Sequence, residues 1–160
     1  MKKTAAIKVS MKELYPLIRE TLDHGQIFCL PITGTSMLPT IKGGRDRVFL
    51  SSAVLPLKKG DLPLYRRDSG QFVLHRIVSV QQDGSYVCCG DNQWIKEPGI
   101  RPDQILAIAA ELERKGRRFP VSNAFYRSWV RLWTVLLPVR FIPIKLGRGV
   151  KKLLRCFSKN

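Results

Sequence analysis

The spacing of apolar residues changes along the chain and divides it into three parts. Residues 10–13, Ser-Met-Lys-Glu, have the pattern of a capping box, which satisfies free backbone N–H groups at the start of a helix. The apolar positions that follow recur at helical spacing until Gly25, and they are Leu14, Leu17, Ile18 and Leu22. The pattern predicts a short amphipathic helix within residues 1–25.

Between residues 26 and 113 the helical spacing disappears. Short runs rich in β-branched, aromatic and Leu residues alternate there with Gly, Pro and Asp. The predicted strands are residues 26–32, 48–51, 62–65, 72–80, 86–89 and 104–112. Asp83-Gly84 is typical of a tight hairpin turn. Because no long helical pattern interrupts this stretch, we expect a mainly β (α+β) chain with a compact antiparallel β body.

A third pattern begins at the basic run 114–118, which we interpret as the end of the β body. Ser122 or Asn123 is placed to cap a helix, and Arg127 and Arg131 flank its apolar stripe. That stripe is Phe125, Trp129, Leu132, Trp133 and Leu136. A second basic segment follows, with Leu146, Val150, Leu153, Leu154 and Phe157. Residues 114–160 are therefore predicted to form a basic amphipathic helical tail.

The formal net charge of +16 is concentrated in this tail. Residues 1–113 carry 15 Lys or Arg against 12 Asp or Glu, whereas residues 114–160 carry 13 Lys or Arg and no acid. A run of like charge opposes compaction unless it meets an anionic partner. We expect an anionic membrane surface as that partner, with nucleic acid less favoured because no DNA-reading motif is recognisable. The alternatives are a solvated tail, or aromatic side chains that pack on the β body or on a partner protein.

Cysteine and histidine usage predicts neither a metal site nor a cofactor. The four cysteines, which include Cys156, show no CxxC spacing, and only His24 and His75 add further soft ligands. Cys88 and Cys89 would face opposite sides of a strand, so we expect packed, reduced thiols.

The sequence also predicts neither an export signal nor a spanning helix. Only three apolar residues follow the basic start before Lys8 interrupts them. No run approaches the roughly 20 apolar residues of a spanning helix. We expect a cytoplasmic protein, or one held peripherally on the cytoplasmic face of a membrane.

A serine nucleophile needs a fixed turn, a base within reach and hydrogen-bond donors for the oxyanion. The segment around Ser36 offers such a turn, because Gly34 allows unusual backbone dihedrals and Pro39 stiffens the exit. Taken alone, a serine in such a loop is more often an ordinary turn residue. A histidine such as His75 in a strand is likewise more often a hydrogen-bonded structural residue. The neighbouring motifs change this balance.

The segment from Gly34 to Leu50, GTSMLPTIKGGRDRVFL, resembles the nucleophile box of signal peptidases. Three further segments resemble boxes of the same family in the same order, and they are the Gly-Asp turn and strand of 59–65, the base-carrying strand of 73–78 and the Gly-Asp-Asn box of 90–92. The likeness covers about residues 26–112. It implies a signal-peptidase-like β domain and a serine endopeptidase that cleaves a signal or leader peptide after a small residue.

The resemblance implies Ser36 as nucleophile and His75 as general base, as in the endoplasmic-reticulum and archaeal-type branch of the family. Bacterial housekeeping members have lysine at the base position, and a lysine needs strong desolvation to act near neutral pH. The acid that orients the imidazole is Asp91, where the family places one, or Glu97, where the Ser-His branch has Asp. Asp103 is a weaker third candidate.

The same comparison suggests how the oxyanion is stabilised. The backbone N–H of Ser36 is the expected donor, and Thr33 or Thr35 is the candidate for a second, because Gly34 stands where some members have serine. Met37 is expected to pack beneath the turn.

The sequence therefore predicts a Ser-His endopeptidase whose activity rises as His75 loses its proton. The alternative is a non-catalytic scaffold that keeps the fold and uses the tail to hold a membrane or a partner. The first hypothesis requires the Ser36 hydroxyl and the His75 imidazole to meet across the fold.

Overall fold

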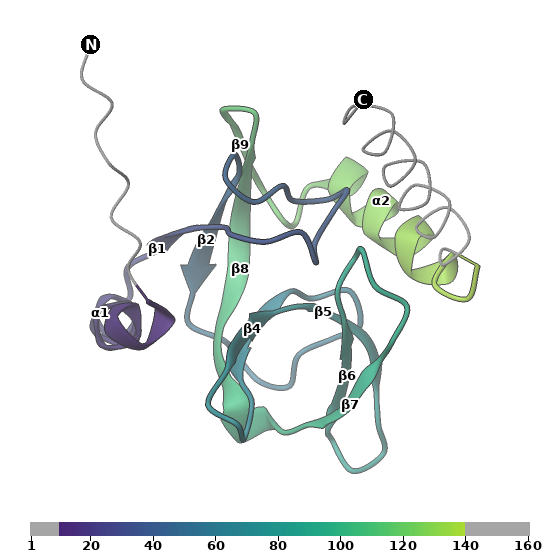
Figure 1. The fold of residues 1–160 in the computed structure, drawn as a ribbon, viewed down its shortest axis with the longest axis horizontal. Coiled ribbons are helices and arrows are strands. Elements are labelled where there is room, and N and C mark those ends of the chain that lie inside the picture. The colour runs from purple at the N-terminus through teal and green to yellow at the C-terminus, as the bar shows by residue number, and fades with distance from the viewer. Residues whose placement is uncertain (1–9, 140–160) are drawn as a thin grey trace, which may run out of the picture.

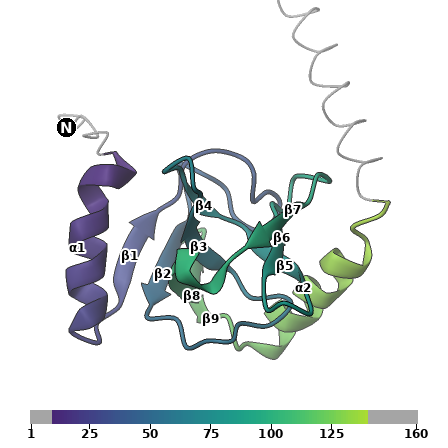
Figure 2. The same ribbon diagram turned by 90° about the horizontal axis from the view of Figure 1, so that it is seen from below.

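The computed structural model of the protein describes residues 10–139, which form two antiparallel sheets and two helices (Figure 1). The helices are α1 (Met11–Asp23) and α2 (Ala124–Val135), and they lie at opposite ends of the β body (Figure 2). The mainly β class predicted from the sequence is confirmed. The predicted second basic segment and Cys156 lie outside the described residues.

The larger sheet has the order β1-β2-β8-β3-β4, and β9 pairs with β8 outside this path. Its strands are β1 (Phe28–Pro31), β2 (Arg47–Ser51), β3 (Pro63–Arg66), β4 (Phe72–Leu74), β8 (Ile105–Arg114) and β9 (Arg117–Pro120). The smaller sheet has the order β5-β6-β7, with β5 (Arg76–Val80), β6 (Tyr86–Cys89) and β7 (Glu97–Ile100). A short 3₁₀ helix, Pro102–Gln104, precedes β8. The sheets curve around a shared interior as a half-barrel (Figure 1).

Helix α1 begins where the capping box predicts. The Ser10 hydroxyl accepts a hydrogen bond from the Glu13 backbone N–H at 3.3 Å, and the Glu13 carboxylate accepts one from the Ser10 backbone N–H at 2.8 Å. The predicted periodicity buries Ile18 and Leu22 in the main core beside the larger sheet and packs Leu14 against it, whereas Leu17 is 52% exposed.

The predicted strand 72–80 is interrupted at His75. Before this residue β4 pairs with β3 in the larger sheet, and after it β5 pairs with β6 in the smaller one. His75 belongs to neither ladder and lies where the chain passes between the two sheets. The sequence does not reveal such a switch, because strand-forming residues stand on both sides of His75 and residues 72–80 have the composition of one strand.

The β body extends beyond the predicted boundary at residue 113. Strands β8 and β9 form a hairpin whose turn, Lys115-Gly116, has φ values of 51° and 78°. The basic run looked like a boundary, but its charges fit a strand because Arg118 pairs with Glu111 and stacks over the Phe49 ring. Strand β7 was also missed, because Pro98 and Gly99 are uncommon inside strands.

Cys88 and Cys89 point into different apolar clusters, as the alternation of a strand predicts. Cys88 packs with Tyr65 and Ile77 between the sheets, whereas Cys89 packs with Leu137 on the other side. Cys88 is a free thiol, and burial raises its pKa to about 12, so this thiol stays protonated.

Helix α2 is capped by Asn123, whose side-chain oxygen accepts hydrogen bonds from the backbone N–H groups of Phe125 and Tyr126 at 2.9 and 3.2 Å. Its buried face differs from the predicted stripe and consists of Tyr126, Val130 and Thr134. Phe125 of the predicted stripe is 88% exposed. Tyr126 can be buried because its hydroxyl accepts a hydrogen bond from Arg76 at 3.2 Å. Neither helix among residues 10–139 is long and apolar enough to cross a bilayer.

The packing of α2 can be tested by comparing two of its residues. Val130→Ala should lower the free energy of unfolding by about 2 kcal/mol, because it removes two buried methyl groups and leaves a cavity. Phe125→Ala, the matched control on the exposed side, should change it by less than about 0.5 kcal/mol. Urea denaturation of the full chain measures both. Equal effects would mean that α2 does not pack on the β body.

Candidate active site

Ser36 lies on the loop that leaves β1, and this loop is anchored in the main core. Met37, directly after Ser36, is 3% exposed, and Ile41 is 1% exposed. The Ile41 backbone N–H donates to the Met37 carbonyl at 2.8 Å. The predicted packing of Met37 beneath the turn is confirmed, and it holds the backbone of Ser36 in place.

Two glycines allow neighbouring backbone to press against this loop. A Cβ atom on Gly43 would lie 2.3 Å from the Gly34 carbonyl oxygen, and one on Gly90 would lie 2.7 Å from the Ser36 carbonyl oxygen. Neither position has room for a side chain. Gly34 has a φ of 82°, a conformation that glycine adopts readily.

The Gly-Asp-Asn segment holds the serine loop from the other sheet. The Asn92 backbone N–H donates to the Ser36 carbonyl at 2.7 Å, and the Asn92 side chain donates to the Thr35 carbonyl at 3.1 Å. The sequence pattern points to this segment but predicts no role for Asn92.

Ser36 and His75 line the same pocket, although they come from separate segments of the fold. This Ser36 pocket has a volume of about 310 Å³, and its lining includes Thr33, Arg67 and Gln93. No hydrogen bond joins Ser36 to His75 in the part of the chain that the structure describes. Catalytic hydrogen bonds are often long before substrate binds, and the shared pocket is the arrangement that such a bond requires.

The environment of His75 favours the neutral imidazole. The side chain is buried, and its Nδ1 atom has no hydrogen-bond partner among residues 10–139. Burial lowers the pKa of His75 to about 4, the carboxylates of Glu97 and Asp91 oppose this shift, and the Arg67 guanidinium adds to it. Near neutral pH the imidazole is therefore unprotonated, as a general base must be.

Asp91, the first candidate for orienting His75, has a different partner. Both of its oxygens accept hydrogen bonds from Arg76, from Nε at 2.9 Å and from Nη2 at 2.7 Å, and both side chains are almost fully buried. Arg76 Nη1 also donates to the Gly60 carbonyl at 3.0 Å. Asp91 makes no hydrogen bond to the imidazole, and its direct contact is with the neighbour of His75.

Glu97, the second candidate, is also held by other residues. Its carboxylate accepts two hydrogen bonds from Arg67, each at 2.5 Å, and one from the Tyr65 hydroxyl at 2.8 Å. Burial would raise the pKa of Glu97, but the bonds from Arg67 and Tyr65 outweigh it and hold the pKa below its ordinary value. Asp103 pairs with Arg101 on the surface.

A second pocket adjoins the first at His75. This Glu97 pocket has a volume of about 540 Å³ and shares Arg67, His75 and Gln93 with the Ser36 pocket. His75 therefore lies between two cavities. Arg67 and Gln93 were not predicted from the sequence as site residues. Only Gln93 had a signal, because it directly follows the Gly-Asp-Asn segment.

The structure distinguishes the candidate oxyanion donors. Thr33 lines the Ser36 pocket, whereas Thr35 does not. The backbone N–H of Ser36 donates no hydrogen bond to any residue that the structure describes. It remains available to a substrate oxygen.

Helix α2 contacts both segments that form the site. The Trp133 indole N–H donates to the Asp91 carbonyl at 3.0 Å, and the Trp129 indole N–H donates to the Thr40 hydroxyl at 3.2 Å. The two indole rings stack with centroids 5.2 Å apart. For these tryptophans the alternative interpretation, packing on the β body, is correct.

Comparison of the chain with models of known protein families, with curated proteins and with solved structures finds no match. Among the described residues, no group of three or more His, Cys, Asp or Glu side chains is arranged to hold a metal ion. The functional assignment therefore depends on the geometry of the site.

The buried pair of Arg76 and Asp91 yields a stability prediction. Asp91→Ala should lower the free energy of unfolding by about 3–5 kcal/mol, because Arg76 would keep a buried charge without its partner. Asp103→Ala, which removes an exposed carboxylate, should leave stability nearly unchanged. Urea denaturation measures both variants.

A double variant, Arg76→Met with Asp91→Leu, should recover much of this stability, because it removes both buried charges together. Full stability of Asp91→Ala alone would contradict the structural role of the pair.

Proposed function

We propose that the chain is a serine endopeptidase of signal-peptidase type, with Ser36 as nucleophile and His75 as general base. The observation that carries the proposal is the shared pocket, which brings a fixed serine loop and a buried neutral imidazole together. A serine becomes a useful nucleophile only beside a base that can accept its proton.

The chemistry follows from the atoms that face the pocket. Because His75 Nδ1 is buried, Nε2 takes the proton as Ser36 Oγ attacks the substrate carbonyl and forms a tetrahedral oxyanion. The Ser36 backbone N–H, with Thr33 as second donor, stabilises that oxyanion. His75 then gives the proton to the leaving amine, and water releases the acyl group from Ser36. The charges of Glu97 and Asp91 favour the transient imidazolium.

The two adjoining pockets support an extended peptide as substrate. The Ser36 pocket is lined partly by apolar side chains such as Ile32, Met37 and Leu64, and the Glu97 pocket by Trp94 and Ile95. A peptide lying across His75 would place residues in both. We propose a signal or leader peptide, cut after a small residue, as the resemblance of the sequence implies.

We further propose that the enzyme works in the cytoplasm or on the cytoplasmic face of a membrane, with the basic stretch 114–160 as the part of the sequence that attracts anionic lipid. Cys29 and Cys88 are free thiols, which suits a reducing compartment.

A serine-directed fluorophosphonate probe tests the nucleophile. The full-length protein should be labelled, Ser36→Ala should lose labelling entirely, and His75→Ala should lower its rate by about 10⁴-fold or more, because the base is gone. The matched controls are Ser79→Ala and His24→Ala, which change exposed residues and should label as the wild type does. Gel fluorescence with mass spectrometry of the labelled peptide gives the readout.

Absence of labelling in folded wild-type protein between pH 6 and 9 would reject the peptidase. It would favour the alternative of a non-catalytic scaffold with the same fold.

The pH dependence of labelling tests the environment of His75. Only the neutral imidazole accepts a proton, and burial holds the pKa of His75 at about 4. The labelling rate should therefore stay level from pH 8 down to about 5 and fall about tenfold per pH unit below about 4. Circular dichroism at each pH confirms that the chain stays folded. A midpoint near pH 6.5, the ordinary value for histidine, would contradict the buried environment.

A further inference from the structure

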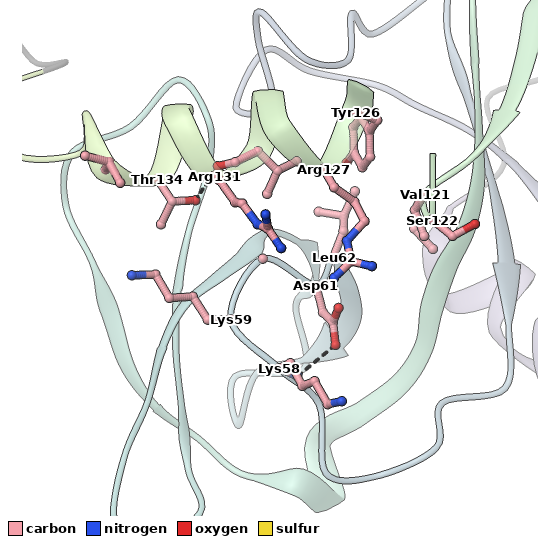
Figure 3. Close-up of a pocket in the computed structure, with 14 residues that line it drawn as sticks. Lys58, Lys59, Asp61, Leu62, Val121, Ser122, Tyr126, Arg127, Arg131 and Thr134 are labelled. Carbon is pink, nitrogen blue, oxygen red and sulfur yellow. Dashed lines mark hydrogen bonds between the residues drawn. The ribbon is translucent and has the colours of Figure 1, made fainter. Parts of the chain in front are cut away.

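A third pocket lies between α2 and the turn that precedes β3, and it shares no lining residue with the Ser36 or Glu97 pockets (Figure 3). Its volume is about 560 Å³. We name it the cationic pocket, because its lining includes Lys58 and Lys59 from the turn and Arg127 and Arg131 from α2.

Positive charge around this pocket is largely uncompensated. Within residues 10–139, none of the four basic side chains forms an ion pair. Asp61 is the one acid among the described residues of the lining, and its carboxylate accepts a hydrogen bond from the Lys58 backbone N–H at 2.8 Å. Figure 3 shows Arg127 and Arg131 reaching from α2 toward the turn. Their spacing of four residues places them on the same side of the helix.

The buried part of the lining is mainly apolar, and the hydroxyls of Tyr126 and Thr134, which also lie there, are hydrogen-bonded to Arg76 and to the Val130 carbonyl. Leu62, Ala109 and Val130 line it and are buried. The turn approaches α2 closely, since a Cβ on Gly60 would lie 3.3 Å from a Val130 methyl carbon. A cationic rim above an apolar base suits the anionic head of an amphiphile better than a small hydrated ion.

The exposed side of α2 indicates which amphiphile fits. Val135 lines the cationic pocket and is 70% exposed, while Leu132 and Phe125 are 54% and 88% exposed on the same helix. Burial of such side chains at the headgroup boundary of a bilayer is favourable, and neighbouring arginines there contact lipid phosphate. A soluble phosphate would make no use of them.

We propose that the cationic pocket binds the phosphate of an anionic phospholipid, so that α2 lies on the membrane with Phe125, Leu132 and Val135 in the headgroup region. This inference deepens the proposed membrane attachment and does not require the peptidase reaction. The net charge of +13 over residues 114–160 adds long-range attraction to the same surface.

Vesicle sedimentation of the full chain tests the site. The probes are vesicles of phosphatidylcholine alone and of phosphatidylcholine with phosphatidylglycerol at about 30%. Wild-type protein should pellet with the anionic vesicles only. Arg127→Ala with Arg131→Ala should weaken this partition by about 25-fold, since each basic residue near an anionic surface contributes about fivefold.

The matched control is Lys12→Ala with Arg19→Ala, which removes the same charge from α1 at the opposite end of the molecule (Figure 2). It should weaken partition by less than about threefold, because screening confines the effect to charges near the surface. All four substitutions are at exposed positions, so circular dichroism should show folded protein throughout.

The other outcomes separate the explanations. Equal losses in the pocket variant and the control would overturn the pocket as the lipid site while leaving membrane attachment in place. No pelleting of wild-type protein would overturn both, whatever the fluorophosphonate probe reports. A third outcome is that the wild type binds inorganic phosphate saturably, the pocket variant does not, and the pocket variant and the control pellet equally with vesicles. That outcome would mean that the ligand of the pocket is a soluble phosphate and not a lipid.

Discussion

The buried ion pair between Arg76 and Asp91 is the constraint on which the rest of the structure depends. Two charges removed from water are stable only when they satisfy each other with good geometry, and these two make paired hydrogen bonds of 2.9 and 2.7 Å. Arg76 also bonds the Gly60 carbonyl and the Tyr126 hydroxyl, so the pair joins the smaller sheet, the turn before β3 and α2. Its members directly follow His75 and Gly90, and one desolvated contact therefore sets the position of both sides of the candidate site.

Contacts of the backbone hold most of the candidate site in place. The serine loop is fixed by Met37 in the core and by the Asn92 backbone N–H. Because Gly90 has no side chain, the Ser36 carbonyl can approach its backbone closely. His75 is positioned by the segment of chain that passes between the two sheets, and burial keeps its imidazole neutral. Neither candidate acid bonds the imidazole, and both influence it through charge across a distance.

Local patterns in the sequence predicted the local structure well. The capping box at Ser10, the Asp83-Gly84 hairpin and the cap at Asn123 each depend on neighbouring residues, and each is present. The joint presence of Ser36 and His75 in one pocket was expected only because of the resemblance to a family. The bonds of Asp91 to Arg76 and of Glu97 to Arg67 could not be predicted. A carboxylate pairs with a cation that is near in space, and spacing along the chain does not show which cation that is. The break at His75 and the strand β9 were not predicted for a similar reason, since the composition of an apolar or basic run does not show which sheet its residues join.

The two tryptophans attach the inner side of α2 to the candidate site. Trp129 bonds Thr40 beyond the serine loop and Trp133 bonds the Asp91 carbonyl, so the helix is attached to both segments that meet at the Ser36 pocket. In the proposed membrane-bound state, α2 lies on lipid by its outer side and holds the Ser36 pocket at a fixed height above the bilayer by its inner side. A peptide anchored in the same bilayer would then present to Ser36 only the bond at that height, so selection of the cleavage point would come from geometry as well as from the fit of side chains.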